Sequence, residues 1–157
     1  MKTEETAVRL LQRLREQGLT LATAESCTGG WIGQTLTAVP GSSASYLGGV
    51  IAYANSVKEA VLGVPAQTLQ EHGAVSAQTA AAMAQGVRRV IGADLSVAVT
   101  GIAGPGSDGT GKPVGLVYMG ICDGVQTKVT EHHFSGDREA VRRQTVEAAL
   151  QTMLQFI

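Results

Sequence analysis

Three polar side chains in the N-terminal part of the chain have the chemistry of a nucleophile and its proton acceptor. Ser26 lies in segment 23–31 (TAESCTGGW), and Tyr53 and Lys58 follow in the next polar stretch. A serine hydroxyl attacks a carbonyl carbon when a neighbouring base takes its proton, and an uncharged lysine amine can be that base. From the residue types alone, Ser26 can be the nucleophile of a Ser-Lys hydrolase with Lys58 as its base, and Tyr53 is a candidate proton relay.

Ser26 is expected in a tight turn between a short apolar strand, 19–24, and a helix that runs to about Val39. Such a turn leaves backbone N–H groups free at the helix start, where they can hold a developing oxyanion or a bound anion. Two alternatives stay open. Ser26 and its neighbours can serve only as a helix cap with turn glycines, and Cys27 can be either the nucleophile or an inert buried thiol.

Lys58 is expected in the first turn of a short helix, 55–62, with Asn55 as its N-cap. The positive end of the helix dipole disfavours an ammonium there, so the pKa of Lys58 should be lowered. The alternatives are a solvated surface lysine and, for Tyr53, a core position with its hydroxyl at the edge.

A third polar segment begins at Thr100 and Gly101 and continues as a glycine-rich loop to residue 113. Its glycines permit backbone N–H groups to converge on a phosphate, although the loop does not match the nucleoside triphosphate motif and can equally be an unstructured connection. The two adjacent histidines, His132 and His133, alternate faces in an expected strand, so no metal site is predicted.

The elements that position these residues alternate between strand and helix and end in a hairpin. Strands are expected at 19–24, 46–53, 95–100, 116–122 and 125–134, and helices at 3–17, 31–39, 55–62, 65–72, 76–91 and from Asp137 onward. This order predicts an α/β fold: a three-layer α/β/α sandwich around a mixed, mostly parallel five-stranded sheet. If the first three strands are parallel neighbours, the polar segments that follow them meet at one edge.

Composition narrows the classes of function. The 157 residues predict a single domain, and the low charged fraction of 16% predicts a homo-oligomer that buries part of the surface. A net charge of −1 gives no electrostatic basis for binding nucleic acid or an anionic membrane. Cys27 and Cys122 form neither a zinc motif nor a disulfide framework, and the absence of a signal-peptide pattern or apolar span predicts a cytoplasmic protein.

Six blocks of sequence, spread over essentially the whole chain and in the same order, closely resemble the nicotinamide-nucleotide amidases of the CinA C-terminal type. They are TAESCTGG at 23–30, YANSVK at 53–58, HGAVS at 72–76, TGIAGP at 100–105, KPVG at 112–115 and GDREAVR at 136–142. The resemblance implies the sandwich fold and hydrolysis of the carboxamide of nicotinamide mononucleotide, giving nicotinate mononucleotide and ammonia, without a cofactor or metal.

The resemblance also implies roles for individual residues. Ser26, Lys58 and Tyr53 match the family's catalytic residues, and further positions lie in blocks that line the family's pocket. These implied substrate-binding residues are Thr28, Gly29, Asn55, Thr100, Gly101 and Arg142. Arg142 or the glycines after Thr100 are expected to bind the phosphate, although a solvated helix position is the alternative for Arg142. A regulatory domain that binds a pyridine nucleotide without hydrolysing it is the competing class of function.

Overall fold

The structure, a computed structural model, describes residues 2–157. Its helices are α1 (Lys2–Gln17), α2 (Trp31–Thr37), α3 (Asn55–Ala60), α4 (Ala66–His72), α5 (Ala77–Ile91) and α6 (Arg138–Phe156), with a short 3-10 helix at Ser42–Ala44. Its strands are β1 (Leu21–Glu25), β2 (Tyr46–Ile51), β3 (Leu95–Gly101), β4 (Leu116–Cys122) and β5 (Thr127–His133).

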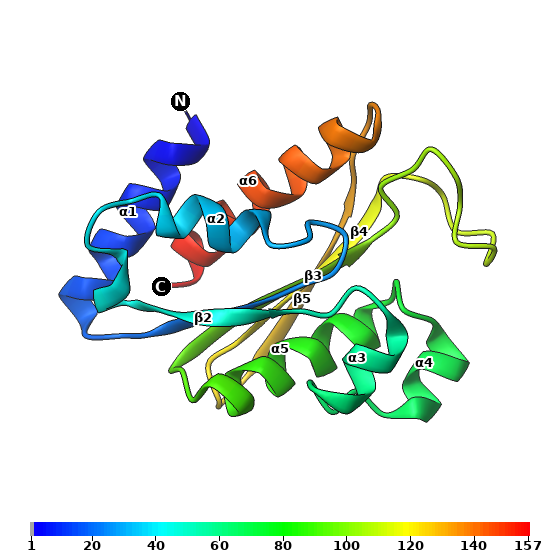
Figure 1. The fold of residues 1–157 in the computed structure, drawn as a ribbon, viewed down its shortest axis with the longest axis horizontal. Coiled ribbons are helices and arrows are strands. Elements are labelled where there is room, and N and C mark those ends of the chain that lie inside the picture. Colours follow the sequence, from blue (N-terminus) through cyan, green and yellow to red (C-terminus); the bar gives the residue numbers. More distant parts are fainter. Residues whose placement is uncertain (1) are drawn as a thin grey trace.

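The predicted fold is confirmed. The five strands form one sheet in the order β2-β1-β3-β4-β5, in which β1 pairs in parallel with both β2 and β3, and β4 runs antiparallel to its two neighbours. Helices α1, α2 and α6 cover one face and α3, α4 and α5 the other, giving three layers (Figure 1). Because β1, β2 and β3 are parallel neighbours, their carboxyl ends meet at one edge, as the sequence predicted.

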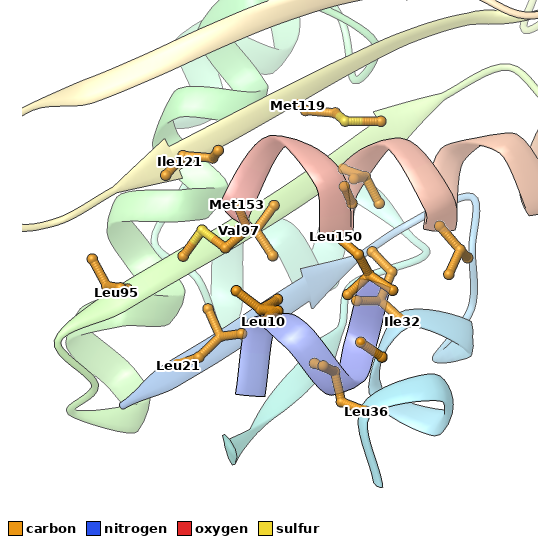
Figure 2. Close-up of a cluster of buried hydrophobic side chains, with 14 of the residues drawn as sticks. Leu10, Leu21, Ile32, Leu36, Leu95, Val97, Met119, Ile121, Leu150 and Met153 are labelled. Atoms are coloured by element: carbon orange, nitrogen blue, oxygen red, sulfur yellow. The ribbon is translucent and has the colours of Figure 1, made fainter. Parts of the chain in front are cut away.

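The larger apolar core lies between the sheet and helices α1, α2 and α6 (Figure 2). The predicted stripe on α1 supplies Ala7, Leu10, Leu11 and Leu14, all of which are buried. A second core on the other face packs α5 against β1 and β3 through small side chains. These two cores fix the central strands, and therefore fix the edge of the sheet at which the polar segments meet.

Two local predictions need correction, the bounds of β1 and the cap of α3. Strand β1 was expected at 19–24 but spans Leu21–Glu25, and so it includes Glu25, whose side chain is buried. Strand β2 is the edge of the sheet, and its side chains alternate between partly buried and exposed. Its pairing with β1 shifts register at the start, because Leu21 pairs with Tyr46 and Ala22 with Gly48, which leaves Leu47 as an extra residue in β2.

Asn55 is not the N-cap of α3. Ala54 occupies the cap position with extended backbone, and its carbonyl accepts from the N–H groups of Val57 and Lys58. By contrast, the side chains of Ser76 and Asp137 cap α5 and α6, where they accept from the N–H groups of Thr79 and Ala140. Within residues 2–157, no helix combines the length and apolar character needed to cross a bilayer.

Candidate active site

A cavity of about 220 Å³ opens at the carboxyl ends of β1, β2 and β3. Three segments that are far apart in sequence contribute to it: the turn after β1, the connection after β2 and the loop after β3. The lining residues are Ser26, Cys27, Tyr53, Lys58, Ala74, Val75, Thr100, Gly101, Ile102, Ala103, Ser107, Asp108 and Arg138. The serine and the lysine predicted from the sequence therefore face the same space.

The carboxylate of Glu25 anchors the turn that carries Ser26, and the residue is only 2% exposed. One carboxylate oxygen accepts from the Thr28 hydroxyl (2.6 Å) and from the Ile32 N–H (2.8 Å). It also accepts from the Gly30 N–H at 3.2 Å, and the second oxygen accepts from the Gly33 N–H at 3.0 Å. A carboxylate at a helix start complements the free N–H groups and the dipole there. Glu25 thus joins the end of β1 to the beginning of α2.

Two glycines let the chain turn sharply between Ser26 and α2. Gly29 and Gly30 have φ angles of 59° and 105°, a region that residues with a Cβ atom rarely adopt. The Ser26 backbone is fixed on both sides of the residue, because its N–H donates to the Val99 carbonyl of β3 and its carbonyl accepts from the Gly29 N–H. The hydroxyl consequently projects from a rigid backbone.

Arg142 of α6 clamps the other side of this turn. Its Nε donates to the Cys27 carbonyl at 3.0 Å, and its Nη2 donates to the Thr28 carbonyl at 3.1 Å. The guanidinium also lies over the ring of Trp31, 5.3 Å from the ring centroid, a cation–π arrangement. Arg142 therefore supports the turn that carries Ser26 and is not among the residues that line the cavity.

Lys58 reaches Ser26 from the neighbouring segment. Its side chain is almost completely buried, with 1% exposure, and Nζ lies 3.1 Å from Ser26 Oγ. Nζ also donates to the carbonyls of Ala52 (2.8 Å) and Tyr53 (3.1 Å). A neutral amine has two N–H bonds and one lone pair. When the two carbonyls take the two N–H bonds, the lone pair is left facing the serine hydroxyl.

The surroundings of Lys58 favour that neutral form. Burial lowers the pKa of the amine from its ordinary 10.5, while Cys27 acts weakly in the opposite direction. Among the described residues, no carboxylate is paired with Lys58. The pKa of Lys58 is therefore lowered, as the sequence predicted, and the largest cause is desolvation by burial. The predicted position of Lys58 in the first turn of the helix is wrong, because Lys58 lies in the last turn of α3.

Cys27 borders the cavity as a protonated thiol. Burial is the largest influence on its pKa and raises it to about 12, so almost no thiolate is present near neutral pH. This environment favours Ser26 over Cys27 as nucleophile. Within the described residues, the Cys27 N–H donates to no other residue's backbone carbonyl, whereas the N–H groups of Gly29, Gly30 and Trp31 are bonded within the turn.

The remaining predicted residues divide into two groups. Thr100 and Gly101 line the cavity, and the Thr100 hydroxyl donates to the Ala74 carbonyl at 2.7 Å, which fixes the wall. Thr28, Gly29, Asn55 and Arg142 are not among the lining residues. Thr28 is fully buried against Glu25, and Asn55 is exposed at the start of α3.

Tyr53 lines the cavity but stands at its mouth, with 64% of the residue exposed. Its hydroxyl accepts from Arg138 Nη2 at 3.3 Å, and among the described contacts it bonds neither Ser26 nor Lys58. Only its backbone carbonyl touches the amine. The proton relay predicted for the Tyr53 hydroxyl therefore has no hydrogen-bonded path in this structure.

Comparison with known proteins places this arrangement in a family. The family model described as the CinA C-terminal domain matches residues 3–157. The chain belongs to the CinA C-terminal domain family. It is 52% identical over 148 residues to a CinA-like protein of Geobacter sulfurreducens, covering 94% of this chain and 35% of that protein. The chain spans about a third of the length of the curated relatives it matches.

Solved structures agree closely with this CinA domain. The competence/damage inducible protein CihA from Agrobacterium tumefaciens is 41% identical, with a TM-score of 0.94 and coverage of 99% of this chain and 95% of that one. A competence-damaged protein (CinA) superfamily protein from Escherichia coli is 36% identical, with a TM-score of 0.97 and coverage of 99% and 90%.

The sequence did not single out two charged residues that the CinA fold brings to this site. Glu25 was part of the turn segment, and a carboxylate just before a glycine-rich helix start was the signal for its anchoring role. Arg138 lay in the quoted block 136–142, but the sequence offered no reason to prefer it to Arg142. The two arginines lie one turn apart along α6, so Arg138 reaches the cavity while Arg142 contacts the turn that carries Ser26.

Proposed function

We propose that this CinA domain hydrolyses the carboxamide of nicotinamide mononucleotide to nicotinate mononucleotide and ammonia. The observation that carries the proposal is the distance of 3.1 Å between Lys58 Nζ and Ser26 Oγ at the wall of a cavity. A buried amine within hydrogen-bond reach of a hydroxyl is the arrangement that activates a serine nucleophile. The resemblance of six sequence blocks to nicotinamide-nucleotide amidases supports the choice of substrate.

In the first half of the reaction, the lone pair of Lys58 accepts the Ser26 proton as Oγ forms a bond to the amide carbon. The carbonyl oxygen of the substrate becomes an oxyanion. The backbone N–H of Cys27, the residue that follows Ser26 in sequence, is the candidate donor to this oxyanion. Lys58, now an ammonium, then gives its proton to the amide nitrogen. The carbon–nitrogen bond breaks, ammonia leaves, and a nicotinoyl ester remains on Ser26.

In the second half, Lys58 accepts a proton from a water molecule as the water oxygen attacks the ester carbon. The bond between that carbon and Ser26 Oγ breaks, and Lys58 returns the proton to Oγ. The acid is released and the resting state is restored. Each step uses the same amine, which is held by the carbonyls of Ala52 and Tyr53 throughout.

The competing function is a regulatory domain that binds a pyridine nucleotide and hydrolyses nothing. The buried amine argues against it, because desolvating a lysine beside a serine is unfavourable for folding and brings no advantage to a site that only binds.

The test is ammonia release from nicotinamide mononucleotide by the wild type and by Ser26→Ala, with Ser43→Ala as the control, an exposed serine that is not among the residues lining the cavity. We expect release by the wild type and by Ser43→Ala, and loss of release in Ser26→Ala. Equal rates for wild type and Ser26→Ala would remove Ser26 from the mechanism. Binding of the nucleotide without any release would favour the regulatory domain.

A further inference from the structure

Arg138 is the first residue of α6, and its guanidinium lies at the mouth of the cavity. Nη1 donates to the Gly104 carbonyl at 2.7 Å, and Nη2 donates to the Tyr53 hydroxyl at 3.3 Å. These two bonds hold the planar group between the connection after β2 and the loop after β3. Arg138 is thus positioned by the two segments that form the mouth.

The guanidinium has hydrogen-bonding capacity left for a ligand. Arginine carries five N–H donors, and the two bonds to Gly104 and Tyr53 leave the others available. Among residues 2–157, the other cationic side chain that lines this cavity is Lys58, whose amine lies at Ser26 and donates to the backbone carbonyls of Ala52 and Tyr53. An anionic part of a ligand therefore has one cationic partner at the mouth.

We propose that Arg138 is the subsite for the phosphomonoester of the substrate and makes the domain selective for nucleotides over nucleosides. This inference rests on the proposed amidase function. The cavity of about 220 Å³ is smaller than the usual pocket for a drug-sized ligand, roughly 300–1,000 Å³, which suits a substrate whose amide-bearing ring enters the cavity while its far end stays at the mouth. Guanidinium and phosphate pair through charge-assisted, often bidentate hydrogen bonds.

Asp108 gives the mouth a second charge of opposite sign. Its carboxylate lines the same cavity, and Oδ1 accepts from the Thr110 N–H and hydroxyl, which leaves Oδ2 without a partner among the described contacts. A carboxylate repels phosphate and accepts hydrogen bonds from sugar hydroxyls. Arg138 and Asp108 together therefore suit a ligand that carries both a phosphate and sugar hydroxyls, as a ribose phosphate does. In this arrangement the phosphate pairs with Arg138 and the hydroxyls with Asp108.

The experiment compares kcat/KM for nicotinamide mononucleotide and for nicotinamide riboside, the same amide without its phosphate. The variants are Arg138→Met, Arg138→Lys and, as control, Arg143→Met, an exposed arginine of the same helix that does not line this cavity. We expect Arg138→Met to lower kcat/KM for the mononucleotide about 10- to 150-fold, the range for a hydrogen bond to a charged group, and to leave the riboside unaffected. Arg138→Lys should recover part of the loss, and Arg143→Met should behave like the wild type.

The outcomes separate this inference from the proposed function. If the wild type hydrolyses the mononucleotide and Arg138→Met lowers kcat/KM equally for both substrates, Arg138 shapes the mouth but does not bind phosphate, and the inference is wrong. An unchanged Arg138→Met variant overturns it as well. If the wild type hydrolyses neither substrate, the proposed function fails, and binding of nicotinate mononucleotide measured by calorimetry still tests Arg138: equal affinity in wild type and Arg138→Met would refute the subsite.

Discussion

Replacing Lys58 with methionine would remove the proposed base while keeping an unbranched chain of similar length in the same buried space. The change deletes the amine 3.1 Å from Ser26 Oγ and its bonds to the carbonyls of Ala52 and Tyr53. A positioned base contributes about 10²- to 10⁴-fold to the rate, which corresponds to about 3–5 kcal/mol of transition-state stabilisation. We therefore expect kcat for ammonia release to fall by that factor.

Lys112 offers a matched control, because its amine also donates to two backbone carbonyls, those of His72 (2.7 Å) and Val75 (2.5 Å). Either methionine variant leaves carbonyls without a donor and should lose about 1–3 kcal/mol of unfolding free energy per group that stays buried. Only Lys58→Met should lose kcat. Equal kcat in Lys58→Met and Lys112→Met, with both proteins folded by circular dichroism, would refute the assignment of Lys58 as base.

The pH dependence tests the same amine in a second way. Burial lowers the pKa of Lys58 below 10.5, so kcat/KM should rise with pH through that lowered pKa and level off before 10.5.

The free energy of unfolding should change over the same range of pH. In the unfolded chain Lys58 keeps its proton up to about pH 10.5, whereas in the folded chain it loses the proton at a lower pH. The buried ammonium therefore destabilises the folded state fully at low pH, and this destabilisation disappears as the pH approaches 10.5. The difference in unfolding free energy, wild type minus Lys58→Met, should therefore increase with pH. A difference that is flat from pH 7 to 10.5 would contradict the lowered pKa.

Two further predictions concern the turn around Ser26. Glu25→Gln places an amide N–H₂ against the N–H groups of the turn, so the unfolding free energy, measured by urea denaturation, should fall by about 1–3 kcal/mol. The control Glu16→Gln, at an exposed position, should leave the unfolding free energy unchanged. Equal urea midpoints for the two variants would show that Glu25 does not anchor the turn. Cys27→Ala should retain ammonia release, and iodoacetamide at pH 8 should not inactivate the wild type, because burial raises the pKa of Cys27 to about 12. Inactivation by the reagent that Cys27→Ala prevents would instead make Cys27 part of the chemistry.

The strand pattern and turn signals predicted the sheet and the meeting of three polar segments, because parallel neighbours must align their carboxyl ends. Strand β4 was predicted at 116–122, the bounds that the structure has, because the predicted hairpin turns directly after it. The proximity of Ser26 and Lys58 followed from the same topology.

What the sequence could not give is the direction of side chains that depend on tertiary packing. Tyr53 follows an edge strand, so its hydroxyl turns outward to Arg138 and not inward to the base. The resemblance led us to expect Arg142 or the glycines after Thr100 at the phosphate, but Arg142 donates to the carbonyls of Cys27 and Thr28 in the turn that carries Ser26. Arg138 and Arg142 are four residues apart, so they lie on the same side of α6, one turn apart along its axis. Helical periodicity does not say which of these two turns reaches the cavity.

The two catalytic groups proposed here are supported unequally by the sheet. The serine follows a central strand held on both sides, whereas the lysine follows the outermost strand, which has a neighbour on one side only. If heat loosens this edge strand first, the amine of Lys58 moves away from the hydroxyl of Ser26 while the central strands remain folded. Thermal inactivation of the domain should accordingly precede its global melting, and the gap between the two temperatures would report the strength of the outermost strand's attachment.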